Sequence, residues 1–262
     1  MTFLKQLNRI LEELLDSTAL QIDKELLIPC LDLTLLKENS SKESISRMAQ
    51  LAQKHQVAAL CVYPHDLLYI PPSFSVRRAS VINFPKGLDS VISCKQQITI
   101  AKKNGAQEID YVFPYVMYLE GNHSSALTHA CDVIAFCKAN QLGIKVILET
   151  GAFSDLELLY QLALELIAMK INFLKTSTGK TETGATLSHA LTLLCAIKES
   201  GAPCGLKVSG GIKTCSQAQY YAFLAQLVLQ KELNYSWFRI GASSLLQELL
   251  NEPALTEPKQ SY

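Results

Sequence analysis

The stretch Ile171-Asn-Phe-Leu-Lys-Thr-Ser-Thr-Gly-Lys180 and its later counterpart Gly205-Leu-Lys-Val-Ser-Gly-Gly211 carry the strongest signal in the chain. In each, a short apolar run places a lysine, Lys175 or Lys207, where a buried strand would carry an apolar residue. Lysine is almost never fully buried without a reason. A buried ammonium tends to lose its proton and become an amine nucleophile near neutral pH. Two such lysines at the ends of successive strands suggest carbonyl chemistry through a Schiff base.

Outward from these lysines, short segments rich in Val, Ile, Leu and Phe alternate with longer segments of helical spacing. Eight strands with interleaved helices in roughly 250 residues match a closed (β/α)8 barrel of the TIM type, an α/β fold. The alternative is an open doubly wound sheet. It is disfavoured because Cys30-Leu-Asp-Leu-Thr34 stands where Gly-x-Gly-x-x-Gly would follow the first strand. The predicted strands are 28–34, 57–63, 79–84, 108–113, 144–149, 172–176, 204–207 and 237–240.

The chain shows no linker or low-complexity run that would divide it into two domains. We expect one barrel domain over residues 1–250, with an additional N-terminal helix from the amphipathic segment 1–16. The segment 251–262 has two prolines, mixed charge and no periodicity, and it ends in Tyr262. We expect this segment to be a flexible C-terminal tail.

Composition excludes several classes of function. Basic and acidic residues balance at 24 each, which argues against a dominant nucleic-acid or anionic-membrane partner. The eight cysteines form no Cys-x-x-Cys pair and the five histidines lack zinc-motif spacing, so we expect reduced thiols and no metal. Charges interrupt the amphipathic N-terminus, and no apolar run approaches bilayer-spanning length. We therefore expect a soluble, cytoplasmic protein.

Charged residues stand in or just after six of the predicted strands. In a barrel, the carboxyl ends of the strands meet at one opening, so these side chains are predicted to converge there and neutralise one another. They are Asp32, Asp110, Glu149, Lys175, Lys207 and Arg239.

Strand parity indicates that the two lysines share one cavity. Lys175 and Lys207 lie on neighbouring strands, about 4.8 Å apart, and each has the parity that can face the barrel interior. A second positive charge disfavours protonation of the first, so one lysine would be held as a free amine. The alternative is that each lysine is exposed or forms an ordinary ion pair with Asp110 or Glu149.

Three small-residue loops follow the sixth, seventh and eighth predicted strands: Ser177-Thr-Gly-Lys180, Ser209-Gly-Gly211 and Gly241-Ala-Ser-Ser244. Glycine lets backbone amides approach a ligand, and barrel enzymes often bind phosphate beyond strands seven and eight. The loops therefore predict a phosphate site. Lys180 is either a phosphate ligand or a solvated residue.

Asp110, in Glu108-Ile-Asp-Tyr-Val-Phe-Pro114, is the natural acid/base candidate on the fourth strand. Its alternative role is to neutralise the lysines without moving a proton. Cys61 is interpreted as a small buried hydrophobe, with a reactive pocket thiol as the alternative.

Together these segments closely resemble the deoxyribose-phosphate aldolase family, in the expected order from the first strand to the last. The departures are Val208 and Ser209, where the family commonly has proline and alanine, and Met169-Lys-Ile-Asn172, where Gly-Ala-Asp is frequent. The segments that carry the resemblance are Leu31-Asp-Leu-Thr34, Asn83-Phe-Pro-Lys-Gly87, Glu108-Ile-Asp-Tyr-Val-Phe-Pro114, Leu148-Glu-Thr-Gly151, Phe173-Leu-Lys-Thr-Ser-Thr-Gly-Lys180, Gly205-Leu-Lys-Val-Ser-Gly-Gly-Ile-Lys-Thr214 and Phe238-Arg-Ile-Gly-Ala-Ser-Ser244.

The resemblance implies a class I aldolase that needs neither metal nor cofactor. Such an enzyme reversibly cleaves 2-deoxy-D-ribose 5-phosphate to D-glyceraldehyde 3-phosphate and acetaldehyde. By motif, Lys175 would form the Schiff base, Lys207 would lower its pKa and assist proton transfer, Asp110 would shuttle protons, and Tyr262 would help to move the enamine proton. The residues predicted to contact substrate or its phosphate are Asp32, Thr176, Gly179, Lys180, Gly210, Gly211, Gly241, Ser243 and Ser244.

Two other functions stay open at this point. One is another barrel aldolase that forms a Schiff base, such as a transaldolase-like enzyme with a different donor substrate. The other is a barrel that binds a sugar phosphate and has no catalytic activity. The expected partners are a small sugar phosphate and an aldehyde, and a homodimer is compatible with the sequence.

Overall fold

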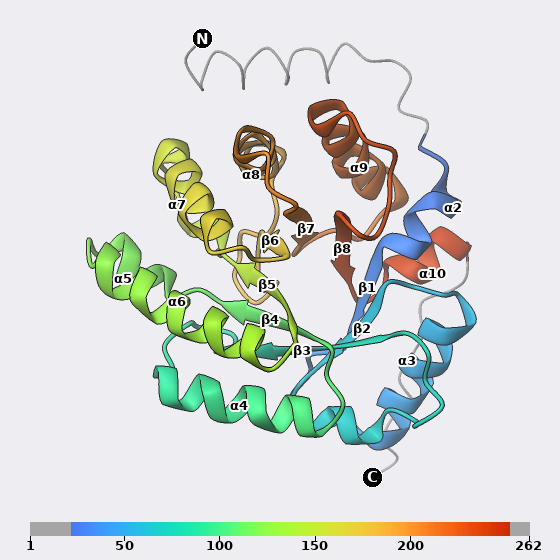
Figure 1. Ribbon diagram of the computed structural model, residues 1–262. Coiled ribbons are helices and arrows are strands. Elements are labelled where there is room, and N and C mark those ends of the chain that lie inside the picture. Colours follow the sequence, from blue (N-terminus) through green and yellow to red (C-terminus); the bar gives the residue numbers. More distant parts are fainter. Residues whose placement is uncertain (1–21, 252–262) are drawn as a thin grey trace.

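Eight parallel strands close into a barrel in the computed structural model, which describes residues 22–251 (Figure 1). The strands pair in chain order, and β1 pairs with β8 to complete the ring. The predicted (β/α)8 barrel is thus confirmed over the open sheet. The strands are β1 (Leu31–Thr34), β2 (Ala59–Val62), β3 (Arg77–Ile82), β4 (Glu108–Val112), β5 (Gly143–Ile147), β6 (Phe173–Lys175), β7 (Gly205–Ser209) and β8 (Phe238–Ala242).

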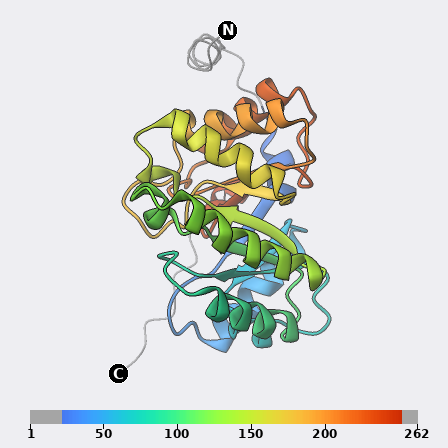
Figure 2. The same cartoon turned by 60° about the vertical axis from the view of Figure 1, so that its left-hand side comes forward.

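Helices surround the barrel, as the two views show (Figures 1 and 2). A short additional helix, α2, precedes β1 on the N-terminal side of the barrel. The amphipathic segment 1–16, in which the additional helix was expected, lies outside the described residues. The helices are α2 (Lys24–Leu27), α3 (Lys42–Lys54), α4 (Val91–Lys103), α5 (Tyr115–Leu119), α6 (His123–Ala139), α7 (Leu156–Ala168), α8 (Leu187–Ser200), α9 (Cys215–Leu229) and α10 (Leu245–Leu250), with 3-10 turns η1 (Ile28–Cys30), η2 (Asp66–Tyr69) and η3 (Thr150–Ala152).

Hydroxyl and carboxyl side chains begin most of the long helices. Ser41, Ser90, Asp155 and Thr186 each accept a hydrogen bond from a backbone N–H in the first turn of α3, α4, α7 and α8. These bonds satisfy donors that the helix itself leaves without a partner. The local sequence therefore fixes where each helix starts, and with it the direction of the loop that leaves the preceding strand.

Each predicted strand differs from the observed one by one to three residues at one or both ends, and two of these differences have a clear local reason. The first strand was expected from residue 28, but residues 28–30 form η1, because Pro29 favours a helical start and has no N–H for a ladder. The fifth strand was expected to reach residue 149. It ends at Ile147, since Glu149 adopts a left-handed backbone with φ of 52° and leads into η3.

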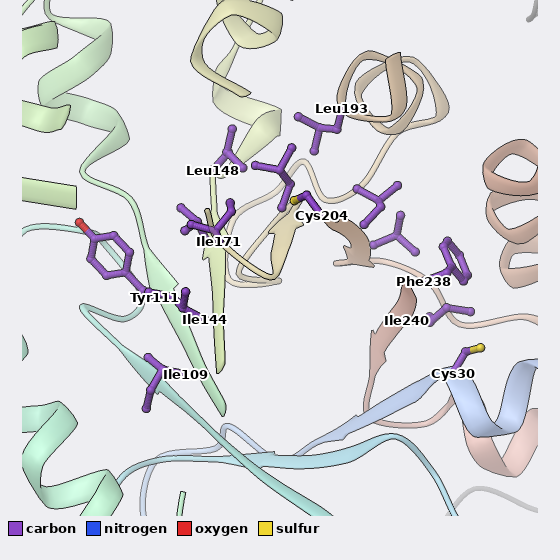
Figure 3. Packing of buried hydrophobic residues seen from close by; sticks show 14 of the residues in the cluster. Cys30, Ile109, Tyr111, Ile144, Leu148, Ile171, Leu193, Cys204, Phe238 and Ile240 are labelled. Atoms are coloured by element: carbon purple, nitrogen blue, oxygen red, sulfur yellow. The ribbon is translucent and has the colours of Figure 1, made fainter. Parts of the chain in front are cut away.

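The main core lies between the outer face of the barrel and the helices. Tyr111, Ile144, Phe238 and Ile240 point outward into it, as Figure 3 shows. On each strand, the residues between these outward-facing ones point into the barrel, because successive side chains of a strand face opposite sides. A small separate apolar cluster, formed by Leu36, Ala59, Cys61, Ala79 and Val81, belongs to β2, β3 and the loop after β1.

The close contact of β6, β7 and β8 depends on a glycine at the start of β7. A Cβ at Gly205 would stand 2.5 Å from Cε1 of Phe173 and 2.5 Å from the carbonyl oxygen of Trp237. A Cβ at the corresponding start of β5, Gly143, would meet nothing closer than 3.4 Å. We therefore expect Gly205→Ala to lower the free energy of unfolding by about 1–3 kcal/mol through overpacking.

Chemical denaturation of Gly205→Ala and of the control Gly143→Ala measures this difference. We expect the control to stay within about 0.5 kcal/mol of the unsubstituted protein. Equal losses in both variants would contradict the packing argument.

Candidate active site

A cavity of about 650 Å³ opens at the carboxyl ends of the strands. The loops after β1, β6, β7 and β8 form its walls, and Lys175 reaches it from β6 with 4% of its side chain exposed. The residues that line it include Thr34, Leu36, Lys175, Thr178, Gly179, Lys180, Ser209, Gly210, Gly211, Lys213, Gly241, Ser243 and Ser244.

Lys175 and Lys207 lie side by side, as strand parity predicts. Their Cα positions are register partners on β6 and β7. The Nζ atoms of Lys175 and Lys207 both donate to one oxygen, Oδ2 of Asp110, at 2.8 and 2.7 Å. Asp110 and Lys207 are fully buried beneath the cavity floor. The lysines and the aspartate therefore form one contiguous unit.

Lys145 on β5 is a third lysine in this unit, and the sequence interpretation did not select it. Its Nζ lies 2.9 Å from Oδ1 of Asp110, 2.6 Å from Glu108 and 3.5 Å from Asp32. Glu108 lies on the same strand as Asp110, two residues before it, and the sequence interpretation gave it no role. The available signal for both was a charged residue inside an apolar strand, at inward parity.

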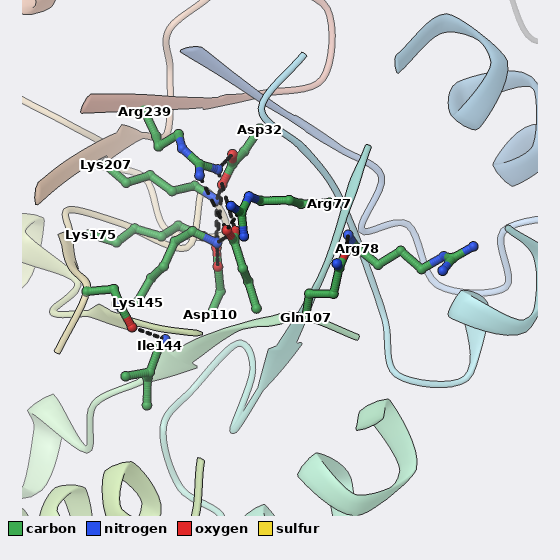
Figure 4. A network of polar contacts seen from close by, with 12 residues as sticks. Asp32, Arg77, Arg78, Gln107, Asp110, Ile144, Lys145, Lys175, Lys207 and Arg239 are labelled. Carbon is green, nitrogen blue, oxygen red and sulfur yellow. Dashed lines mark hydrogen bonds and ion pairs between the residues drawn. The ribbon is translucent and has the colours of Figure 1, made fainter. Parts of the chain in front are cut away.

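Arg239 on β8 completes the network (Figure 4). It donates to Asp32 at 2.7 Å and to Glu108 at 3.3 Å, and its guanidinium lies over the Phe173 ring, 5.2 Å from the centroid. Asp32 in turn accepts a hydrogen bond from Lys207 at 2.6 Å. The barrel interior therefore holds an ionic network that extends from β1 through β4 to β8.

The charges of this network do not balance if every group is ionised. Four cations face three carboxylates, an excess of one positive charge. Arg77 also approaches Glu108, at 3.6 Å, but its side chain is 52% exposed and water screens it. An uncompensated charge in a buried site is costly, so one neutral lysine is the arrangement that balances the interior. The four cations are Lys145, Lys175, Lys207 and Arg239, and the three carboxylates are Asp32, Glu108 and Asp110.

Lys175 is the lysine that favours neutrality. Burial lowers the pKa of Lys175 below its ordinary value, the positive charge of Lys207 lowers it further, and Asp110 only partly opposes these effects. Burial also acts against the charge of Lys207, yet Asp110 and Asp32 overcome it and raise the pKa of Lys207. The pKa of Lys145 is raised in the same way by Asp110, Glu108 and Asp32. Charge repulsion thus contributes as predicted, but burial contributes more.

Asp110 and Asp32 remain carboxylates at neutral pH. Burial would raise the pKa of each, but Lys145, Lys175 and Lys207 hold the pKa of Asp110 well below its ordinary range. Lys207, Lys145 and Arg239 do the same for the pKa of Asp32. In the resting site, Asp110 is therefore a hydrogen-bond acceptor and counter-charge, and it shares its two oxygens among three lysines.

Four predicted residues lie elsewhere than expected. Glu149 does not join the network, because its left-handed backbone turns it toward the loop after β6. Arg239 faces the amino-terminal mouth of the barrel, where it lines a second cavity with Glu108. Asp32 and Thr176 are fully buried and are not part of the lining of the first cavity, although both were predicted to contact substrate.

Glu149 instead holds the loop that follows β6. Its carboxylate accepts hydrogen bonds from the backbone N–H of Thr178 at 3.3 Å, from the Thr178 hydroxyl, and from the Thr181 hydroxyl at 3.1 Å. The Thr178 hydroxyl accepts a bond from the N–H of Lys180 at 3.1 Å. A buried carboxylate therefore fixes the shape of this cavity wall.

The other predicted phosphate-binding residues line the cavity. Gly210 has a φ of 88°, and a Cβ at the facing Gly184 would stand 2.3 Å from the carbonyl oxygen of Gly210. This close approach holds the loop after β7 against the loop after β6. The Nζ of Lys180 donates to the carbonyl oxygen of Leu36 at 2.7 Å, so it closes the wall toward β1.

Other predictions concern groups outside this network. Cys61 is fully buried and burial raises the pKa of its thiol to about 11, which matches a small packed hydrophobe. Between residues 22 and 251, no group of three or more His, Cys, Asp or Glu side chains is placed to hold a metal ion. Over the same residues, no helix has the length and apolar character to cross a membrane. Tyr262 lies outside the described residues.

Comparison with known proteins identifies the family of the chain. Over 243 residues the chain is 35% identical to a deoxyribose-phosphate aldolase of Agrobacterium fabrum, covering 90% of this chain and 93% of that protein. The structure of a deoxyribose phosphate aldolase from Aeropyrum pernix superposes with a TM-score of 0.75 at 23% identity, covering 93% and 97% of the two chains. An aldolase called QR15 gives 0.73 at 24% identity, covering 88% and 97%. Residues 27–247 match the family model described as DeoC/LacD family aldolase, and the chain belongs to that family.

Proposed function

We propose that this protein is a class I deoxyribose-phosphate aldolase. It would reversibly cleave 2-deoxy-D-ribose 5-phosphate to D-glyceraldehyde 3-phosphate and acetaldehyde, through a Schiff base on Lys175. The observation that carries the proposal is a lysine at the floor of the cavity, Lys175, which shares one oxygen of Asp110 with Lys207 at 2.8 and 2.7 Å. Burial of Lys175 lowers its pKa and so favours the free amine. The name of the Agrobacterium fabrum relative supports the choice of substrate.

The chemistry begins with the neutral amine of Lys175. Its lone pair attacks C1 of the open-chain sugar, and loss of water gives a protonated imine. The C3 hydroxyl then loses its proton, the C2–C3 bond breaks, and its electron pair moves toward the imine to leave an enamine. D-Glyceraldehyde 3-phosphate departs. Protonation of the enamine carbon and hydrolysis of the imine release acetaldehyde and restore the amine.

Lys207 and Asp110 handle protons in this scheme. Lys207 has a raised pKa and carries the proton that the departing water needs. Asp110 accepts hydrogen bonds from both lysines at the same oxygen, so a proton can pass between Lys207 and the site of reaction. Tyr262 at the end of the chain stays a proposed donor for the enamine carbon.

The loops after β6, β7 and β8 would bind the 5-phosphate. Backbone N–H groups of small-residue loops bind anions well, and the cavity volume of about 650 Å³ suits a small sugar phosphate. Lys180 would exchange its bond to the Leu36 carbonyl for the phosphate. The residues proposed to contact the phosphate are Gly179, Lys180, Gly210, Gly211, Gly241, Ser243 and Ser244.

Borohydride reduction in the presence of acetaldehyde tests the covalent step. We expect a stable ethyl adduct on Lys175, because the neutral amine there forms an imine that the hydride reduces. Peptide mapping by mass spectrometry locates the adduct, and the other lysines of the chain are internal controls. Lys175→Leu should lose at least about 1000-fold of the cleavage rate on deoxyribose 5-phosphate, since it removes the nucleophile.

An adduct elsewhere, or cleavage that persists in Lys175→Leu, would contradict the proposal. A donor preference for dihydroxyacetone units over acetaldehyde would indicate a transaldolase-like enzyme instead. Adding a chelator to the cleavage assay should leave the rate unchanged.

Glu149→Gln tests the phosphate-binding wall. Loss of the charged acceptor for Thr178 and Thr181 should loosen the loop and raise KM for deoxyribose 5-phosphate about 5–10-fold. The value of kcat should change less than about twofold, because Lys175 is held by Asp110, whereas Glu149 holds the loop after β6. Steady-state kinetics with deoxyribose 5-phosphate and with unphosphorylated deoxyribose measure both.

Glu182→Gln is the matched control, since Glu182 lies in the same loop and is exposed. It should behave as the unsubstituted protein does. If Glu149→Gln weakened both substrates equally, the carboxylate would be a general stabiliser of the barrel and not a support of the phosphate site.

A further inference from the structure

We propose that Glu108 and Arg239 are positioning residues that set the protonation of Lys175 by balancing charge across the barrel interior. Neither lines the cavity that holds Lys175. Both line the second cavity, at the amino-terminal mouth of the barrel. The inference rests on the proposed function, in which Lys175 must be a neutral amine to react.

Glu108 is connected to Lys175 through a chain of three ion pairs. It lies 2.6 Å from Lys145, whose Nζ is 2.9 Å from Oδ1 of Asp110, and the other oxygen of Asp110 is 2.8 Å from Lys175. Side-chain exposure along this route is 9% at Glu108 and at most 4% elsewhere. Screening by water is therefore weak over the whole path.

Arg239 is connected to Lys175 through a second route. It bonds Asp32 at 2.7 Å, Asp32 accepts from Lys207 at 2.6 Å, and Lys207 shares an oxygen of Asp110 with Lys175. The two routes meet at Asp110 and are joined at the far end, where Arg239 lies 3.3 Å from Glu108. Removing one charge at that end therefore alters the balance felt at Lys175.

The strand register explains why the cations need distant counter-charges. Lys175, Lys207 and Arg239 are successive register partners on β6, β7 and β8, so three cationic side chains lie in one row. Figure 4 shows them reaching side by side toward Asp32 and Asp110. Together with Lys145, these three side chains make four cations, and Asp32 and Asp110 supply only two negative charges. Glu108 supplies the third negative charge.

The direction of each effect follows from the sign of the charge. Without the negative charge of Glu108, the interior repels a proton on Lys175 more strongly, and its pKa falls. Without the positive charge of Arg239, two carboxylates lose a partner, and the pKa of Lys175 rises. Each shift should be about one unit at these separations. The ionisable groups that face this site are Asp32 on β1, Cys61 on β2, Arg77 on β3, Glu108 and Asp110 on β4, Lys145 on β5, Lys207 on β7 and Arg239 on β8.

The experiment compares Glu108→Gln, Arg239→Met and the variant that carries both. Removing both charges leaves two cations and two carboxylates around a neutral Lys175, so its pKa should return toward the original value. Arg239→Lys is the conservative control, because it keeps the charge. If the substitutions instead acted by damaging the structure, both single variants would change the apparent pKa of Lys175 in the same direction, and the double variant would show the larger change.

The readout is the pH dependence of imine formation at Lys175 with acetaldehyde, trapped by cyanoborohydride and quantified by peptide mapping. Acetaldehyde carries no phosphate, so the substrate does not titrate in the same range. A lysine peptide treated in parallel corrects for the pH dependence of the reductant. The apparent pKa obtained belongs to the coupled site, and its shift between variants is the quantity of interest.

We expect the apparent pKa to fall in Glu108→Gln, to rise in Arg239→Met, and to lie near the original value in the double variant and in Arg239→Lys. Shifts in the same direction for the two single variants, or no shift, would overturn the inference while leaving the proposed function intact. If Arg239→Met does not fold, a fall in Glu108→Gln supports the inference and an unchanged profile overturns it. The absence of an adduct in the unsubstituted protein would overturn the proposed function itself, and this inference with it.

Discussion

The carboxylate of Asp110 is the contact on which the rest of this site depends. One of its oxygens accepts hydrogen bonds from Lys175 and Lys207, and the other accepts from Lys145. Shared among three lysines, it cannot stabilise a full positive charge on each of them. Burial then selects the lysine that gives up its proton, and Lys175, which reaches the cavity, is the one whose pKa is lowered. The sequence left open whether Lys175 forms an ion pair with Asp110 or is a reactive free amine. In the structure Lys175 contacts Asp110, and its lowered pKa still favours the uncharged amine.

The barrel makes this arrangement possible by dividing its interior. Small apolar residues of β2 and β3, among them Ala59 and Ala79, fill one side, so the charged side chains of the other strands meet on the opposite side. A Cβ at Gly241 would stand 3.0 Å from Cε of Lys207, so glycine there leaves room for the lysine stem. The helix caps and the Glu149 contacts fix the loops above. The barrel therefore holds the amine of Lys175 and the small-residue loops in fixed positions around the same cavity.

Much of the fold and part of the site could be predicted from the sequence. The barrel follows from the rhythm of eight apolar segments, and the adjacency of Lys175 and Lys207 follows from parity on consecutive strands, because parallel register is nearly fixed in a closed barrel. Lys145 and Glu108 were missed because each shares its predicted strand with another charged residue, Glu149 or Asp110, that lies nearer the carboxyl end. Glu149 was misplaced because only the backbone reveals its left-handed turn. The burial of Asp32 depends on long side chains from β5, β7 and β8 that cover it, and the sequence around Asp32 carries no signal of this.

The central claim is that Lys175 is a neutral amine in the resting protein while Lys145 and Lys207 are ammonium groups. The most direct measurement is the Nζ chemical shift of lysines in a protein labelled with ¹⁵N-lysine, followed through a pH titration and assigned with Lys175→Leu. The account predicts that near neutral pH the resonance lost in Lys175→Leu has the shift of a free amine, with the other two buried lysines still charged. Ammonium shifts for all three buried lysines near neutral pH, or a free amine at Lys145 or Lys207, would contradict it.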